Sequence, residues 1–372
     1  MPGSDLLPTD SSNYASQTHV WRSLELPRQI RARTDDTHTV AIARNQLAGC
    51  RSHSACSRPC ATRLPSRLID VGLPNNSSSP VLRDTSDSTG EYATLSHCWG
   101  SELTLETTKS NIEAHTKSIP LSYLPATFRD AVAYTRALGL RYLWIDALCI
   151  IQDDEADWRR EAAAMCSIFE NGAVCLSALF AGSSGVGFLH ENSLDQVEFN
   201  VQGATLGIRP RTDTLPEAIQ SSKLETRAWC LQERVLAPAT LYFGRHQSYW
   251  LCRSAVEPCP IDDQDPDNTE ASILDVLWLG MRDLASLSDF ASLSAWWDVI
   301  RNYSARQITK PTDRLPAVSG LVEKFFRRWP QSHYIYGLWS HAMLAGLLWR
   351  REPVMRARQR TAAPSWSWAS VN

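Results

Sequence analysis

An apolar run with one acid near its middle occupies Arg141-Tyr142-Leu143-Trp144-Ile145-Asp146-Ala147-Leu148-Cys149-Ile150-Ile151-Gln152-Asp153-Asp154. Apolar residues flank Asp146 on both sides, and the run ends in two acids. This pattern predicts a strand covered on both faces, as in the parallel sheet of an α/β domain. Asp146 is then expected near the carboxyl end of the strand, where open α/β sheets bind ligands.

The segments around this run alternate between strand and helix. In chain order we predict a strand at 92–96, a helix at 126–138, the run itself, a helix after Asp153 or Asp154, and a strand at 174–179. Pro125 and Gly139 mark the two ends of the first helix. The second helix has an inner stripe of Trp158, Ala162, Met165 and Phe169. This order argues for a mostly parallel sheet with crossover helices.

The rest of the chain divides into further regions. Short strands at 197–201 and 204–208, and again at 240–243 and 248–252, predict two added β-hairpins, with a short helix at 229–236 between them. The C-terminal part is expected to be mainly helical, with Trp296, Ile300, Tyr303, Ile308, Leu321, Phe325 and Phe326 in its core. We predict a disordered arm at 1–36, a lead-in segment at 37–84, a central domain at 85–255, a linker at 256–268 and a helical region at 269–372.

Composition narrows the possible partners and location. The net charge is −3, and basic residues form no sustained block, so no nucleic-acid partner is expected. No apolar stretch suits an export signal or a membrane span, which predicts a cytoplasmic protein. In that setting the 10 cysteines are expected to be free thiols or metal ligands rather than disulfides. The 14 tryptophans fit a packed interior, a ligand cleft or a partner surface.

A cluster of soft ligands lies in the lead-in segment. Cys50, His53, Cys56 and Cys60 occur within eleven residues, and a tetrahedral zinc ion can in principle gather such a set. The spacing matches no established zinc pattern. Free thiols at a helix end and loop are therefore the favoured interpretation, and no metal is predicted.

Five segments, in this order, resemble the fungal heterokaryon-incompatibility (HET) domain family. They are the segment 92–100, the segment 124–131, the run from Trp144 to Asp154, the group Asp157-Trp158 with Glu161 and Met165, and Trp229 with Leu231-Gln232-Glu233-Arg234. The resemblance spans residues 85–255. It implies a fungal protein that responds to an allelic non-self protein or an unidentified sensor and triggers growth arrest or programmed cell death after fusion of unlike hyphae.

The HET family is similar in inferred fold to Toll/interleukin-1 receptor (TIR) domains, which are flavodoxin-like. Some TIR domains hydrolyse NAD with a glutamate on a helix, and Glu161 is the nearest counterpart here. The resemblance thus implies NAD as a candidate substrate and no bound cofactor. The alternative is a non-catalytic signalling module that forms homo-oligomers or recruits partner proteins.

Each candidate side chain also has a structural interpretation. Glu161 borders the apolar stripe of its helix, where a carboxylate can stabilise an oxocarbenium-like centre or form an ion pair with Arg129, Arg159 or Arg227. The expected ligand-binding residues are Ser96, Trp99, Asp146, Trp158, Gln232 and Glu233, each of which can instead cap, pair or pack locally. A thiol hydrolase built from His97, Cys98 and Cys149 is disfavoured because adjacent strand residues point to opposite faces.

Overall fold

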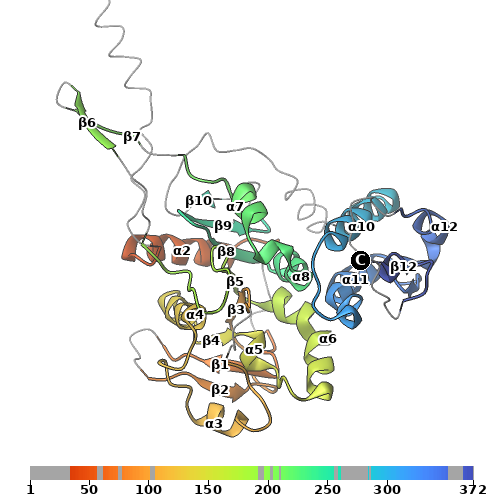
Figure 1. The fold of residues 1–372 in the computed structure, drawn as a ribbon, viewed down its shortest axis with the longest axis horizontal. Helices are drawn as coiled ribbons and strands as arrows, with labels where there is room; N and C mark the ends of the chain where they lie inside the picture. The colour runs from red at the N-terminus through yellow and green to blue at the C-terminus, as the bar shows by residue number, and fades with distance from the viewer. Residues whose placement is uncertain are drawn as a thin grey trace, which may run out of the picture.

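The computed structural model describes residues 34–56, 62–73, 78–100, 105–191, 197–201, 204–208, 211–254, 259–260, 284, 286–350 and 363–371. Statements below refer to these residues. The predicted linker at 256–268 lies outside them, apart from 259–260, as do Cys60 and most of the predicted N-terminal arm. Figure 1 shows the fold.

One eight-stranded sheet forms the centre of the described structure. Its strands are β1 (Arg67–Asp70), β2 (Val81–Asp84), β3 (Tyr92–Ser96), β4 (Tyr142–Trp144), β5 (Val174–Ser177), β8 (Ala239–Phe243), β9 (Ser248–Cys252) and β10 (Cys259–Pro260), in the order β10-β9-β8-β5-β3-β4-β1-β2. The four central strands β8, β5, β3 and β4 are parallel, whereas β9 and β1 run antiparallel to their neighbours. The predicted α/β class with a parallel core is confirmed.

The parallel strands reverse their order at one point. Numbered along the chain as 1 to 4, the strands β3, β4, β5 and β8 lie in the order 2-1-3-4, so the reversal falls between β3 and β5. In open α/β sheets, ligands bind outside the carboxyl ends of the strands at such a reversal. The topology therefore directs attention to the residues that follow β3 and its two neighbours.

The apolar run at 141–154 forms a shorter strand than the sequence predicts. β4 ends at Trp144, and Asp146–Cys149 forms the short helix α5. The expectation of a strand through the second half of the run is wrong because Asp146 begins a helical turn, in which its Oδ1 accepts from the amide of Ala147 at 2.8 Å. Asp146 does follow the carboxyl end of a parallel strand, as predicted.

The two faces of the sheet differ in chemistry. Helices α2 (Thr37–Cys50) and α4 (Ala126–Ala137) lie on one side of the sheet, and α6 (Glu155–Asn171) and α8 (Trp229–Leu236) lie on the other (Figure 1). The strand registers place Ala93, Leu95, Val174, Leu176, Leu241 and Phe243 on the α4 side. They place Thr94, Ser96, Cys175, Ser177, Thr240 and Tyr242 on the α8 side. The helices α6 and α8 thus cover a row of polar side chains, which is unusual for a buried parallel sheet.

The helices that cover the sheet follow the sequence signals. Pro125 precedes α4, and Gly139, just beyond its end, has a φ of 81° that favours glycine. Asp154 caps α6 by accepting from the amides of Ala156 and Asp157. Within α6, Phe169 packs edge-on against Trp144 with a centroid separation of 5.6 Å. Both predicted helices are confirmed.

The remaining elements extend this core. Strands β6 (Val197–Val201) and β7 (Ala204–Ile208) form the first predicted hairpin, and β8 and β9 form the second, which joins the central sheet. Strands β1 and β2 come from the predicted lead-in segment, so that segment and the central domain share one sheet. Helix α3 (Ile112–Lys117), helix α7 (Leu215–Ser221) and the 3-10 helix η1 (Leu224–Thr226) complete this part. None of the described helices has the length and apolar character needed to cross a membrane.

The C-terminal region packs against α6 and α8. It contains α10 (Asp289–Ser304), η2 (Pro311–Asp313), α11 (Pro316–Arg328), β11 (Tyr334–Ile335), β12 (Leu338–Trp339), η3 (Ser340–Ala342), α12 (Met343–Gly346) and η4 (Trp368–Ser370). Its core gathers around Trp296, whose ring meets Phe325, Tyr334 and Trp339 edge-on. The predicted core is confirmed at Trp296, Tyr303 and Leu321 but is wrong at Phe326, which is 38% exposed. Phe326 adjoins the buried Phe325, and the two side chains leave a helix on different sides.

Candidate functional site

Two predicted ligand residues meet at the carboxyl ends of β3 and β4. The indole Nε1 of Trp99 donates to Oδ2 of Asp146 at 2.8 Å. The Asp146 side chain is 24% exposed, and Trp99 is half-buried. Since Trp99 and Asp146 follow adjacent parallel strands, the sheet itself brings this pair together, as the sequence predicts.

A buried serine and glutamate pair lies beside them at the end of β3. Ser96 Oγ donates to Oε2 of Glu233, on α8, at 2.5 Å. Ser96 is 4% and Glu233 6% exposed. Burial raises the pKa of Glu233 to about 7; the cation of Arg227 works against this rise, and the charge of Asp146 adds to it. Glu233 can therefore exchange a proton near neutral pH.

Arg227 supplies positive charge to this group. Its guanidinium donates to the backbone carbonyl of His97, which follows β3. Burial opposes its charge, but Cys230 and the carboxylates of Glu233 and Asp146 together raise the pKa of Arg227. The sequence names Arg227 only as a structural partner for Glu161. No local sequence pattern predicts that Arg227 lies near Glu233, because the two residues are separated by the turn between η1 and α8.

The neighbouring histidine and thiols do not form a nucleophilic pair. His97 packs edge-on against Phe128 of α4, and burial lowers its pKa to about 4 despite the opposing charge of Asp146. Burial raises the pKa of Cys98, and it raises that of Cys149 to about 12. At neutral pH both sulfurs are protonated thiols, which disfavours a nucleophilic thiolate at either position.

A narrow pocket reaches Ser96 from the α8 side of the sheet. It is lined by Ser96, Cys175, Ser177, Leu179, Ile219, Leu224, Glu225, Cys230, Arg234, Thr240 and Tyr242. Five of these residues belong to the polar row described above. The space holds roughly one water molecule. The polar face of the sheet thus provides a small polar recess next to Ser96.

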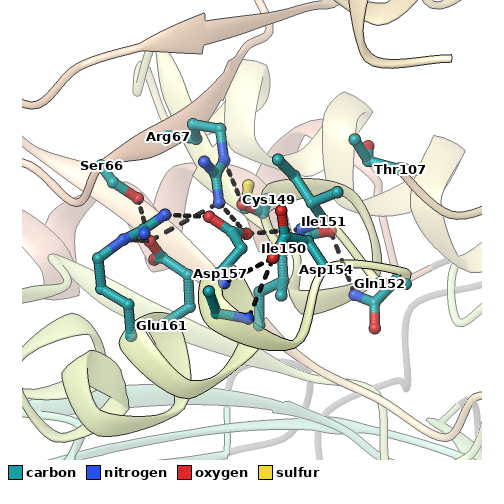
Figure 2. Close-up of polar contacts among 12 residues, drawn as sticks. Ser66, Arg67, Thr107, Cys149, Ile150, Ile151, Gln152, Asp154, Asp157 and Glu161 are labelled. Atoms are coloured by element: carbon teal, nitrogen blue, oxygen red, sulfur yellow. Dashed lines mark hydrogen bonds and ion pairs between the residues drawn. The ribbon is translucent and has the colours of Figure 1, made fainter. Parts of the chain in front are cut away.

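Glu161 lies in a separate ionic cluster (Figure 2). Its Oε1 accepts from Ser66 Oγ at 2.6 Å and lies 3.7 Å from the guanidinium of Arg67 and 3.5 Å from that of Arg160. The same two arginines pair with Asp157. Glu161 is 2% exposed, so the burial expected from its helix position is observed. These contacts are those of a structural ion pair, which is the alternative that the sequence leaves open, but the arginines are Arg67 and Arg160. The expected partners Arg129, Arg159 and Arg227 are wrong.

The last two predicted ligand residues lie outside this group. Gln232 is fully buried between α8 and α11, where its Oε1 accepts from the amide of Gly320 at 3.3 Å. Trp158 is half-buried and meets the ring of Trp229 edge-on at 6.1 Å. Of the predicted side chains, Ser96, Trp99, Asp146 and Glu233 are therefore brought together.

The fold and site define an α/β protein with a carboxylate-containing site where the strand order reverses. Residues 92–233 match the family model described as Heterokaryon incompatibility protein (HET). The chain therefore carries a HET domain, which confirms the resemblance and indicates a role in heterokaryon incompatibility. No curated protein and no solved structure matches the chain.

Proposed function

We propose that this HET domain acts in fungal allorecognition by hydrolysing NAD, and that the loss of NAD triggers growth arrest or programmed cell death after fusion of unlike hyphae. The observation that carries the proposal is the Ser96–Glu233 pair at the strand-order reversal, beside the partly exposed Trp99 and Asp146. The strand order 2-1-3-4 supports a TIR-like fold, since flavodoxin-like sheets begin with the same order.

The proposed reaction uses Glu233 as a general base. The bond between C1′ of the ribose and the nicotinamide nitrogen breaks, and nicotinamide leaves as a neutral molecule. Water adds to C1′ to give ADP-ribose, and its proton passes to the Glu233 carboxylate and then to solvent. A carboxylate with a pKa near 7 suits this step, because it is partly ionised at neutral pH and still basic enough to accept a proton.

Other residues of the group bind and orient the substrate in this proposal. The ring of Trp99, held by Asp146, offers a flat surface for an aromatic base. Asp146 offers its carboxylate to the ribose hydroxyls or to the positive charge that develops at C1′. Arg227 provides a cation near the site for the pyrophosphate. Glu161 stays a candidate from the resemblance, and the experiment below separates it from Glu233.

The test combines purified protein with a host cell. Full-length protein is incubated with NAD, and nicotinamide and ADP-ribose are quantified for wild type, Glu233→Gln, Asp146→Asn and Glu161→Gln. We expect Glu233→Gln to lower the rate by about 10²- to 10⁴-fold. Glu113→Gln, at an exposed carboxylate on α3, is the matched control and should keep the wild-type rate. The same variants are induced in yeast while cellular NAD and viability are followed. Toxicity with unchanged NAD contradicts the proposal.

A non-catalytic signalling module is the second candidate. Several large apolar side chains of the C-terminal region are exposed, among them Phe290 at 84%, Leu344 at 83% and Leu348 at 82%. Exposed apolar residues of this size suit contact with a partner or a second copy. If this candidate is correct, Leu344→Asp with Leu348→Asp abolishes toxicity in yeast, while Glu233→Gln stays as toxic as the wild type.

A further inference from the structure

Four metal-ligating side chains converge at the joint between α2 and β9. Cys50 ends α2, His53 and Cys56 lie in the turns that follow, and Cys252 ends β9. Their ligand atoms all lie within 4.8 Å of one another. The sequence suggests a local set completed by Cys60, but in the structure the fourth member comes from a strand 199 positions away from His53. Sequence spacing gives no sign of Cys252 because only the fold brings it near.

We propose that Cys50, His53, Cys56 and Cys252 bind a structural zinc ion. Three sulfurs and one imidazole are a known ligand set for tetrahedral Zn²⁺. With Zn–S bonds of about 2.3 Å, tetrahedral ligand atoms lie about 3.7 Å apart. Nδ1 of His53 lies 3.7 Å from Sγ of Cys252, and the remaining distances need only small side-chain movements to close on an ion.

The surroundings suit a thiolate-rich metal site. Cys50, Cys56 and Cys252 are 6%, 4% and 3% exposed, which shields the ligands from competing water. Ser254 Oγ lies 3.5 Å from Sγ of Cys56 and can donate to it. Arg253 interacts electrostatically with Cys56, and its cation offsets the net negative charge of one zinc ion with three thiolates. Cys50, Cys56 and Cys252 are all free cysteines, so their sulfurs remain available as ligands.

The site has a structural rather than a catalytic character. Four protein ligands fill a tetrahedral shell and leave no position for water or substrate. Helix α2 packs against β8 and β9, and the ion would fasten the end of α2 to β9. A zinc ion at this position would link residues far apart in the sequence. The free energy of zinc binding would therefore add to the stability of the folded state.

The proposal is tested by measuring the zinc content of the protein and of variants in which a ligand residue is replaced. Full-length protein purified from cells without an affinity tag that binds metal is analysed for zinc. We expect about one zinc per chain, and we expect Cys252→Ser to lose it with an affinity drop of more than ~100-fold, since even residues that only orient a ligand contribute ~10- to 100-fold. Cys166→Ser, at a buried cysteine on α6, is the matched control and should retain the ion.

A second variant covers the case in which Cys252→Ser fails to fold. His53→Cys creates a four-cysteine set, which also binds zinc. We expect it to retain one ion, and we expect the visible spectrum of its Co²⁺ form to differ from that of the wild-type Co²⁺ form. A chelator should lower the melting temperature of wild type. Zinc-free wild type that a chelator leaves unchanged, or a disulfide between any two of the three cysteines in non-reduced peptide maps, overturns the proposal.

Discussion

Single buried groups give this protein an unusual response to pH. The pKa of Glu233 rises from an ordinary 4.5 to about 7, so the folded protein binds more protons than the unfolded chain between these values. Stability therefore falls as pH rises through this window. Burial lowers the pKa of His97 from 6.5 to about 4, so here the unfolded chain binds the extra proton and stability rises with pH. Each effect amounts to about 3 kcal/mol, and the two oppose each other.

Replacing Glu233 or His97 should reveal how the other residue alone makes the free energy of unfolding depend on pH. In Glu233→Gln the free energy of unfolding should rise between pH 4.5 and 6.5, because the titration of His97 is then no longer opposed by that of Glu233. In His97→Asn it should fall over the same range. Urea unfolding at several pH values measures both slopes. Identical pH dependence in wild type and the two variants would contradict the assigned directions.

A prediction about stability separates Glu161 from Glu233. Glu161 accepts from Ser66 and faces two arginines, so Glu161→Gln should lower the free energy of unfolding by about 1.5–3 kcal/mol, the range for hydrogen bonds to charged groups. Glu155→Gln on the same helix is the control, because this carboxylate is 78% exposed and should change stability by less than ~1 kcal/mol. Denaturant unfolding of wild type, Glu161→Gln and Glu155→Gln measures these changes in stability. An unchanged midpoint for Glu161→Gln would argue against the structural role.

Sequence alone predicts some site residues better than others. Ser96, Trp99 and Asp146 follow strands, and parallel strands share a carboxyl edge, so their meeting is predictable. The pairing of Glu233 with Ser96 and Arg227 depends on how α8 lies across the polar row of the sheet. That placement is a property of tertiary packing, and no local pattern encodes it.

Helix α11 packs closely against α6 and α8 at Gly320. A Cβ at Gly320 would lie 2.7 Å from Oε1 of Gln232 and 3.0 Å from Cβ of Cys166. Gly320→Ala should therefore cost about 1–3 kcal/mol through overpacking. Gly49→Ala is the matched control, because this helical glycine in α2 has open space around it and should gain up to about 1 kcal/mol. Thermal unfolding measures the melting temperatures of both variants. Equal changes in melting temperature would show that α11 can shift to accommodate the added methyl group.

The apolar run at 141–154 shows where sequence patterns mislead about elements. Burial is predicted correctly on both sides of Asp146, yet a strand occupies only the first part and a helix the second. Continuous apolar runs look alike in buried strands and buried helices, so periodicity cannot separate them. The end of the strand is set by Asp146, whose carboxylate accepts from the next amide.

At the scale of the whole molecule, the C-terminal region completes the central core. Gln232 and Cys166 both bond to Gly320, so removal of this region exposes buried groups on α6 and α8. A chain that ends at residue 283 should lose cooperative thermal unfolding and bind a hydrophobic dye, while the full chain does neither. A cooperative transition within a few degrees of the full chain would show that the central region folds alone.

The end of α2 cannot complete its packing until β9 has been synthesised, so its folding lags behind its synthesis. His53 leaves the ribosome long before Cys252, which follows 199 positions later. At ~5–20 residues per second, the thiols of Cys50 and Cys56 wait on the order of 10–40 s for their partner. During that interval the nascent chain presents unpaired thiols and the uncovered inner side of α2 to the cell. The native packing of the end of α2 is therefore complete only after β9 has been synthesised.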